Sequence, residues 1–179
     1  MRCYLSGSMA GRFSEEVKAE RAEASSALAK IGIRAADPGA AESQLWGRHV
    51  KSKISTKYKY KIIEAMVKRD LWLIRRCDLL LVLTGDQVSD GTWQEWVYAN
   101  IIGIPVIMVA PKRYRGELSG WANVTIPKGN IVPNLKAACN LIKRKYLKED
   151  GQFKAYFNAA IKNANRNIKN GKSKKQKKH

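Results

Sequence analysis

The sequence predicts an α/β protein built on a doubly wound parallel sheet. Short apolar runs alternate with segments of helical periodicity, and the run at 78–83 is unbroken, as in a strand buried on both faces. Glycine or Asp-Pro-Gly follows several of these segments and ends them. Because ligands of such sheets bind outside the carboxyl ends of the strands, the strand exits are where chemistry is expected.

Each predicted strand is a short apolar segment that ends at a glycine, a proline or a polar residue. The strands, about five in number, are expected at 2–6, 33–36, 78–83, 104–109 and around 130–132. Helices are expected at 14–30, about 54–76, 90 to Gly103, from near 134, and 150–168, with residues 39–53 as a loop.

Helical spacing predicts which side chains of these helices are buried. They are Val17, Ala24, Leu28 and Ile31 in the first, Ile62, Ile63, Met66, Val67, Leu71 and Ile74 in the second, and Trp93, Trp96, Val97 and Ile101 in the third. We expect an α/β domain over 1–147, a helical extension over 148–168 and a disordered Lys-rich tail over 169–179.

The chain of 179 residues carries 34 Lys and Arg against 15 Asp and Glu, a net charge of +19. Residues 141–179 hold 13 of the basic and two of the acidic residues, so +11 lies there. The tail could contact nucleic acid nonspecifically or serve only solubility. A second basic region, 48–76, interleaves tyrosines with lysines, as a nucleic-acid groove would, but a mobile loop leading into a solvated helix face is favoured.

Several classes of protein are excluded by simple features of the sequence. No apolar run approaches the roughly 18 residues of a membrane span, and no extended apolar region follows Met1 as in a secretory signal. Cys3, Cys77 and Cys139 are too far apart for a zinc motif or a disulfide framework. We therefore expect a cytoplasmic protein with reduced thiols and neither metal nor cofactor.

Polar residues follow three of the predicted strands: Ser6-Gly7-Ser8, the segment 84–92, and the segment from Pro111 onward. Gly7 lets the backbone approach a ligand, and Ser8 with the free N–H groups of the next turn could bind phosphate. An ordinary tight turn explains the same residues. Neither a dinucleotide-binding fingerprint nor a Walker A loop is present.

Two carboxylates are candidates for chemistry. Glu95 follows Asp90-Gly91-Thr92 in the first turns of a helix, where the partial charge of the helix N-terminus would keep it ionised and nucleophilic. The alternative is helix capping by Asp90 with ordinary dipole compensation. Asp70 lies among apolar helix positions, and its alternative is an ion pair with Arg69, Arg75 or Arg76.

Taken together, these residues resemble the nucleoside 2-deoxyribosyltransferase superfamily, closest to its nucleoside 5′-monophosphate N-glycosidases. The resemblance spans about residues 1–142. It rests on Tyr4-Leu5-Ser6-Gly7-Ser8, on Arg69-Asp70-Leu71 with the strand after Cys77, and on Asp90-Gly91-Thr92-x-x-Glu95-x-x-x-Ala99 before Gly103-Ile104-Pro105-Val106. It implies a flavodoxin-like fold and attack on the anomeric carbon of a (deoxy)ribosyl group.

The resemblance also implies roles for the catalytic residues. Glu95 would attack C1′ and form a covalent glycosyl-enzyme, and Asp70 would protonate or orient the leaving base. Tyr4 matches a tyrosine near the nucleophile. Two carboxyl groups are what a retaining glycosyl transfer requires, one as nucleophile and one for proton transfer.

Other matches bear on a 5′-phosphate. Ser89 stands where the hydrolases have serine and the transferases an acid, Gly7 and Ser8 match a phosphate-binding pair, and Ser119 resembles a serine supplied by a neighbouring subunit. A homodimer or higher homo-oligomer is implied. Met9 replaces a phosphate-contacting arginine, for which Arg12 or the basic loop 112–115 could substitute.

The expected activity is hydrolysis of the N-glycosidic bond of a (deoxy)nucleoside 5′-monophosphate, with Asp90 and Gly91 beside Ser89 in the substrate site. Two alternatives stay open. A deoxyribosyltransferase would exchange bases and could use Asp90 as its acid. A non-catalytic module would bind nucleotides or nucleic acid without turnover.

Overall fold

The structure is a computed structural model in which the chain forms two compact units, residues 1–139 and 140–179. The residues described are 1–7, 14–39, 56–84, 88–111 and 120–147. The predicted helix at 150–168, the tail and most of the loop at 39–53 lie outside them. The predicted domain boundary at 147 stays a prediction.

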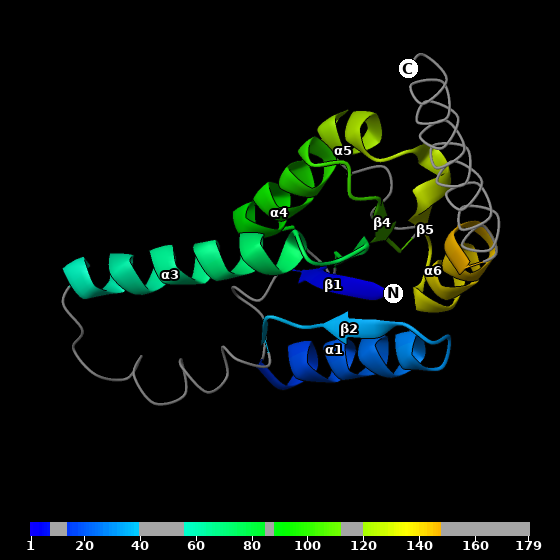
Figure 1. Ribbon diagram of the computed structural model, residues 1–179, viewed down its shortest axis with the longest axis horizontal. Helices are drawn as coiled ribbons and strands as arrows, with labels where there is room; N and C mark the ends of the chain where they lie inside the picture. Colours follow the sequence, from blue (N-terminus) through cyan, green and yellow to red (C-terminus); the bar gives the residue numbers. More distant parts are fainter. Residues whose placement is uncertain (8–13, 40–55, 85–87, 112–119, 148–179) are drawn as a thin grey trace, which may run out of the picture. The chain divides into compact units, whose positions relative to one another are not determined.

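Five parallel strands form one sheet in the order β2-β1-β3-β4-β5 (Figure 1). They are β1 (Arg2–Gly7), β2 (Arg34–Ala36), β3 (Leu79–Leu83), β4 (Val106–Val109) and β5 (Ile131–Val132). This order is that of flavodoxin-like folds, so the predicted class and strand number are confirmed. The order reverses between β1 and β3, and ligands of open α/β sheets bind outside the carboxyl ends of the strands at such a point.

Helices connect the strands. They are α1 (Ser14–Ala29), α3 (Thr56–Ile74), α4 (Asp90–Ile101), α5 (Gly120–Thr125) and α6 (Leu135–Ile142), with a 3₁₀ turn η2 (Lys128–Asn130) and a π-helical turn η3 (Lys143–Leu147). The sequence predicted α1, α3, α4 and α6 but not α5. Gly32 and Gly103 follow α1 and α4 with φ of +77° each, a backbone conformation that only glycine adopts without strain.

The core of the first unit forms on both faces of β1 and β3, whose residues are almost all buried. Helix α1 packs beside β2, whereas α4 packs against β1, β3 and β4 and contacts α3 (Figure 1). Side chains alternate between the faces. Tyr4, Leu80 and Val82 therefore share one cluster with Trp96 of α4 and Ile74 of α3.

Three predicted core positions are wrong. Ile101 in the last turn of α4 is 76% exposed, and Ile63 and Val67 of α3 are 40% and 44% exposed. Helix α3 is far longer than the strands beside it, so its amino-terminal half extends past the sheet while Ile74 near its end is fully buried (Figure 1).

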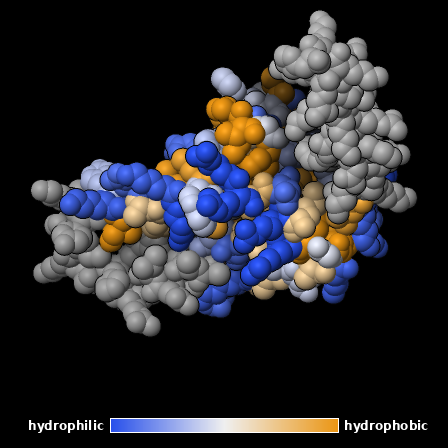
Figure 2. All heavy atoms as spheres, in the orientation of Figure 1, coloured by the Kyte–Doolittle hydropathy of each residue, from blue (hydrophilic) through white to orange (hydrophobic). Residues whose placement is uncertain are grey.

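An aromatic cluster joins α4 to α5. The Trp93 and Trp96 rings are stacked with centroids 4.4 Å apart, and Trp121 meets Trp93 edge-on at 6.1 Å. The indole N–H of Trp96 donates to Thr125 Oγ1 at 3.2 Å. Trp121 and Val124 are nevertheless exposed, and Figure 2 shows apolar surface over these two helices. The cluster ties α4, which carries Glu95, to the helix that precedes β5.

Three further predictions concern thiols, membranes and metals. Cys3, Cys77 and Cys139 are free thiols and are buried. In the part of the chain that the structure describes, no helix has the length and apolarity to cross a bilayer. Among the same residues, no three His, Cys, Asp or Glu side chains are grouped so that they could hold a metal ion.

Candidate active site

The site is built where β1 faces α4. Tyr4 and Ser6 are two residues apart on β1 and therefore point to the same face of the sheet. Helix α4 buries Thr92, Trp96 and Ala99 on its inner side, and Glu95 lies between them in its second turn. Three side chains from segments about 90 residues apart in the sequence meet at this point.

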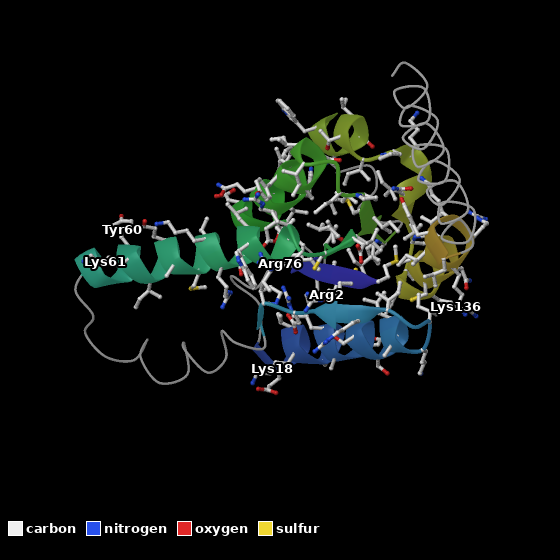
Figure 3. All side chains as sticks on the ribbon, in the orientation of Figure 1. Arg2, Lys18, Tyr60, Lys61, Arg76 and Lys136 are labelled. Atoms are coloured by element: carbon white, nitrogen blue, oxygen red, sulfur yellow. The ribbon has the colours of Figure 1, made fainter. Side chains whose placement is uncertain are left out.

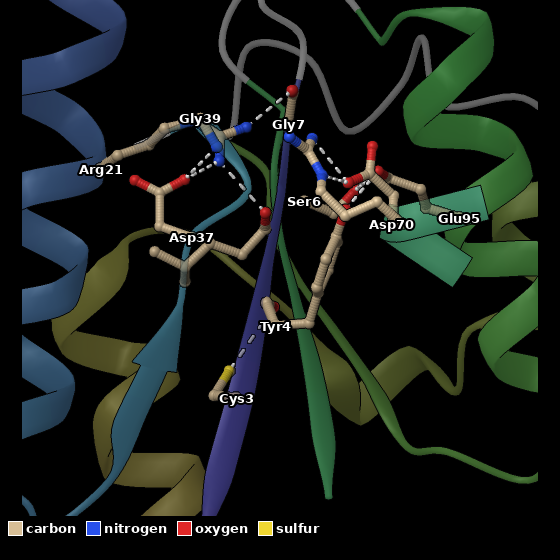
Figure 4. A network of polar contacts seen from close by, with 11 residues as sticks. Cys3, Tyr4, Ser6, Gly7, Arg21, Asp37, Gly39, Asp70 and Glu95 are labelled. Carbon is tan, nitrogen blue, oxygen red and sulfur yellow. Dashed lines mark hydrogen bonds and ion pairs between the residues drawn. The ribbon is translucent and has the colours of Figure 1, made fainter. Parts of the chain in front are cut away.

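The Glu95 carboxylate accepts one hydrogen bond on each oxygen (Figure 4). The Tyr4 hydroxyl donates to Oε1 at 2.6 Å, and the Ser6 hydroxyl donates to Oε2 at 2.5 Å. Such short bonds are typical of an O–H donor and an ionised acceptor. The carboxylate is thus oriented by two neutral donors, and the predicted pairing of Tyr4 with Glu95 is present.

Burial is the main influence on the ionisation of both partners. It raises the pKa of Glu95, and the Ser6 and Tyr4 hydroxyls oppose that rise by stabilising the carboxylate. It also raises the pKa of the Tyr4 phenol, as does the neighbouring Glu95, so Tyr4 stays protonated and acts as a donor.

The ionisation of Glu95 depends on more than the start of α4. The residue lies in the second turn, and the effect of a helix dipole falls off within the first turn. Burial raises the pKa of Glu95, and the Ser6 and Tyr4 hydroxyls of β1 stabilise its charged form. A contribution of the helix N-terminus stays a prediction.

Asp70 of α3 is the second carboxyl group of the site (Figure 4). Burial raises its pKa, whereas Arg69 lowers it through Nε and Nη2, which lie 2.9 and 2.8 Å from Asp70 Oδ1. Its charge also raises the pKa values of Tyr4 and Glu95. The alternative interpretation of Asp70, an ion pair with Arg69, is therefore present, and the charge of Asp70 also reaches Tyr4 and Glu95. A catalytic role for Asp70 stays a prediction.

The amino end of α4 differs from the prediction in one respect. Ser89, not Asp90, is the N-cap, and its hydroxyl accepts the Thr92 N–H at 3.3 Å and lies 3.0 Å from the Thr92 hydroxyl. Asp90 is an exposed residue of the first turn, where a negative charge is favourable. Gly91 is exposed beside it. Binding of phosphate by these residues stays a prediction.

Gly7 at the end of β1 is required by the sheet itself. A Cβ at this position would lie 2.7 Å from the carbonyl oxygen of Leu83, its partner in β3. The sequence suggested that Gly7, which has no side chain, leaves room for a ligand. On this side that room is occupied by the neighbouring strand β3. Ser8, Arg12 and Ser119 lie outside the described residues, as does the basic loop 112–115.

Three contributors were missed by the sequence reasoning. Ser6 was noted only as part of a polar strand exit, although its spacing from Tyr4 places both hydroxyls on one face. Arg21 of α1 and Asp37 after β2 form a pair on the other side of β1 (Figure 4). No local pattern marks them, because their positions depend on how α1 packs beside β2.

Together, the fold and the site are those of a doubly wound α/β protein that holds a partly buried, hydroxyl-bonded carboxylate and a second carboxyl group near the carboxyl ends of its strands. The chain belongs to the family described as "Domain of unknown function (DUF4406)", whose model matches residues 1–108.

Similar structures have also been solved. The chain is similar to the Clostridium botulinum CMP N-glycosidase BcmB, with 18% identity over 80% of this chain and 98% of that one and a TM-score of 0.47. No curated protein matches the sequence.

Proposed function

We propose that the protein hydrolyses the N-glycosidic bond of a (deoxy)nucleoside 5′-monophosphate. The observation that carries the proposal is the Glu95 carboxylate, which is partly buried at the strand ends and accepts hydrogen bonds on both oxygens from the Tyr4 and Ser6 hydroxyls. Neutral hydroxyl donors orient the carboxylate without the loss of nucleophilicity that a bonded cation would cause. The second carboxyl group, Asp70, supports acid–base chemistry beside it.

The reaction proceeds in two displacements. A Glu95 oxygen bonds to C1′ as the C1′–N bond breaks, and the electron pair of that bond goes to the base nitrogen, which takes the proton of Asp70. Water then attacks C1′, the C1′–O bond to Glu95 breaks, and Asp70 takes a proton from the water. The products are the free base and (deoxy)ribose 5-phosphate, and both carboxyl groups return to their first state.

The raised pKa values suit these roles. A raised pKa favours the protonated Asp70 that the first displacement needs. The Tyr4 phenol, whose pKa is raised, is not a base but a donor that steadies the Glu95 carboxylate. When a Glu95 oxygen bonds to C1′, the carboxylate loses its negative charge. The Tyr4 and Ser6 hydroxyls are then released to bond the developing ester or the ring oxygen.

Recognition of the 5′-phosphate is assigned to Ser89 and the free N–H groups at the start of α4. Helix N-termini bind phosphate through such groups and through their partial positive charge. Ser89 is only half-buried and Gly91 leaves space beside it. The proposed phosphate site also includes a second subunit and a cation supplied by Arg12 or by the loop 112–115.

The test is to incubate the protein with a panel of nucleosides and nucleoside monophosphates and to follow free base by chromatography. Glu95→Gln is expected to reduce base release by about three orders of magnitude or more, as loss of a nucleophile does. Asp70→Asn is expected to slow the reaction by about 10²–10⁴-fold. A covalent sugar phosphate on Glu95 should be detectable by mass spectrometry after acid quench.

Glu64→Gln is the matched control, because Glu64 is an exposed carboxylate of the same helix as Asp70 and pairs only with Lys68 among its described contacts. Its base release should equal that of the wild type. Undiminished release in Glu95→Gln would reject the nucleophile, and the absence of release from every substrate would reject the proposed function. Formation of a new nucleoside when a second free base is added would instead favour the transferase.

A further inference from the structure

Arg21 is a buried arginine whose contacts all lie around the end of β1. It belongs to α1 and is 5% exposed. Its Nη1 donates to the Leu5 carbonyl at 3.2 Å and its Nη2 to the Gly7 carbonyl at 3.1 Å. Nη1 also bonds Asp37 Oδ1 at 2.5 Å, and the same oxygen accepts the Gly39 N–H. One guanidinium thus connects α1, β1 and the segment after β2.

The reason for these contacts lies in the register of the sheet. The Met1 carbonyl accepts the Arg34 N–H, so the odd-numbered carbonyls of β1 face β2. If this pattern continued in steps of two residues, the N–H of position 38 would donate to the Leu5 carbonyl. However, Pro38 has no N–H, and β2 ends at Ala36. Among the described residues, the Leu5 and Gly7 carbonyls therefore have no strand partner on this side, and Arg21 donates to both.

The two carbonyls that Arg21 binds flank Ser6. Because side chains alternate along a strand, the Ser6 side chain points to the opposite face, where it donates to Glu95 Oε2 (Figure 4). The guanidinium holds the peptide group before Ser6 through the Leu5 carbonyl and the peptide group after Gly7 through the Gly7 carbonyl, while β3 pairs with the same stretch on the other edge. The backbone held in this way sets the direction of the Ser6 Cα–Cβ bond, from which the hydroxyl extends toward Glu95.

A purely stabilising role does not explain a buried ion pair well, because desolvation offsets most of its attraction. Replacement of such a pair by apolar groups is often neutral or favourable. What apolar groups could not do here is bond two carbonyls at once, which the fork of a guanidinium does. The Arg21 charge also lowers the pKa of Glu95 from across the strand.

We propose that Arg21 is a positioning residue that holds the Ser6 hydroxyl against Glu95 through the Leu5 and Gly7 carbonyls. This rests on the proposed function for its kinetic consequence, although the geometric claim does not require it. Asp37 orients the guanidinium, since its Oδ1 is bonded by both Arg21 and Gly39. The end of β1 is thereby kept rigid beside a nucleophile that must be aimed at C1′.

The kinetic test compares Arg21→Lys, Ser6→Ala and the double variant with the wild type. Lysine keeps the charge but cannot bond both carbonyls and Asp37 in the same fork. Arg21→Lys is expected to lower kcat about tenfold, with little change in KM, as loss of an orienting partner does. If Arg21 acts through Ser6, the double variant will be no slower than Ser6→Ala alone. Rates that fall multiplicatively in the double variant would overturn the proposal.

Lys18→Gln is the matched control. Lys18 lies on α1 one turn before Arg21, but it is exposed, points away from the sheet and pairs with Glu15 (Figure 3). The substitution removes a charge and an ion pair from the same helix without touching β1. Its kcat should equal that of the wild type. An Arg21→Lys variant as active as this control would also overturn the proposal.

A second measurement does not depend on activity. Carbon-13 NMR titration of the Glu95 carboxyl group reports its pKa directly. Ser6→Ala removes the Ser6 hydroxyl, and Arg21→Lys is expected to move it away from Glu95. Both substitutions should therefore raise the pKa of Glu95, whereas Lys18→Gln should leave it unchanged. A wild-type titration curve in Arg21→Lys would refute the positioning role even if the protein released no base. Should Arg21→Lys fail to fold, Asp37→Asn loosens the same guanidinium and is expected to shift the Glu95 pKa in the same direction.

Discussion

At the scale of single residues, the site depends on Glu95, a partly buried carboxylate beside a second carboxyl group, Asp70. The Ser6 and Tyr4 hydroxyls stabilise the charged form of Glu95, and burial opposes them. At Asp70, burial is likewise opposed by Arg69. Burial therefore raises the pKa of both carboxyl groups, and the charge of Asp70 adds to the rise at Glu95.

The first prediction concerns the pH dependence of base release. The nucleophile must be ionised and the acid protonated, so kcat/KM should follow a bell-shaped curve. Its acid limb should have a midpoint above 4.5, the ordinary value for glutamate, because the Glu95 pKa is raised. Initial rates from pH 4 to 10 measure this. An Asp70→Asn variant that retains the alkaline limb would show that Asp70 is not the acid.

The second prediction concerns stability. The pKa of Glu95 is higher in the folded protein than in the unfolded chain, so unfolding releases a proton at pH values between the two. The free energy of unfolding should therefore fall as pH rises from 4.5 through the folded pKa, and Asp70 adds a fall of the same sign. Urea midpoints measured across this range should show a weaker dependence on pH in Glu95→Gln. An identical dependence in that variant would contradict the raised pKa.

At the scale of elements, the carboxyl end of β1 and the amino end of α4 are the two parts that hold the site. The strand end is fixed by Gly7 against β3 and by Arg21 on the other edge. The helix start is fixed by the Ser89 cap. Substitutions at Gly7 and Ser89 can therefore distinguish a role in stabilising the fold from a role in binding a ligand.

Gly7→Ala should destabilise the protein by about 1–3 kcal/mol, the usual cost of forcing a methyl group into packed structure. Its Cβ would lie 2.7 Å from the Leu83 carbonyl oxygen, and a backbone atom cannot move aside cheaply. Gly91→Ala is the matched control, because its Cβ would meet nothing closer than Ser89 Oγ at 4.0 Å. Chemical denaturation compares the two. Equal stability of both variants would contradict the argument.

Ser89 can be tested for two roles at once. Ser89→Ala removes the cap of α4 and should cost about 1 kcal/mol of stability. Ser89→Asp should preserve the cap, because aspartate caps helices as well as serine does, but its charge would repel a phosphate. We expect a raised KM for nucleoside monophosphates and an unchanged KM for nucleosides. Unchanged KM for both substrates would remove Ser89 from the phosphate site.

At the scale of the whole molecule, the net charge of +19 is concentrated at the carboxyl-terminal end, where residues 141–179 carry +11. None of that charge belongs to the described residues of the candidate active site. Those residues come from β1, α1, the segment after β2, α3 and α4, all before residue 96. The positive surplus and the candidate chemistry are therefore separable.

Removal of residues 169–179 tests that separation. The segment holds six lysines, so its loss should flatten the dependence of single-stranded DNA binding on salt by up to about 4 in the log–log slope. Base release should be unchanged. Fluorescence anisotropy at several salt concentrations gives the slope. A slope equal to that of the full chain would show that the tail does not carry nucleic-acid contact.

Much of the fold was predictable because it follows from local patterns. The unbroken apolar run of β3, the period of α1 and the glycines after α1 and α4 express burial, amphipathicity and backbone freedom, which neighbouring residues determine. The errors at Ile63, Val67 and Ile101 arose at apolar helix positions that the described part of the fold leaves exposed. Periodicity indicates an apolar face but not what covers it.

Local patterns and a family resemblance were enough to predict the parallel α/β architecture and to single out Glu95, Asp70 and Tyr4. The contact of Ser6 with the second oxygen of Glu95, and the bonds of Arg21 to the Leu5 and Gly7 carbonyls, became evident in the folded chain. So did burial as the largest influence on the pKa of Glu95. The physical reason is that hydrogen bonds and desolvation depend on distances between segments far apart in the chain, which only the packed sheet and helices define.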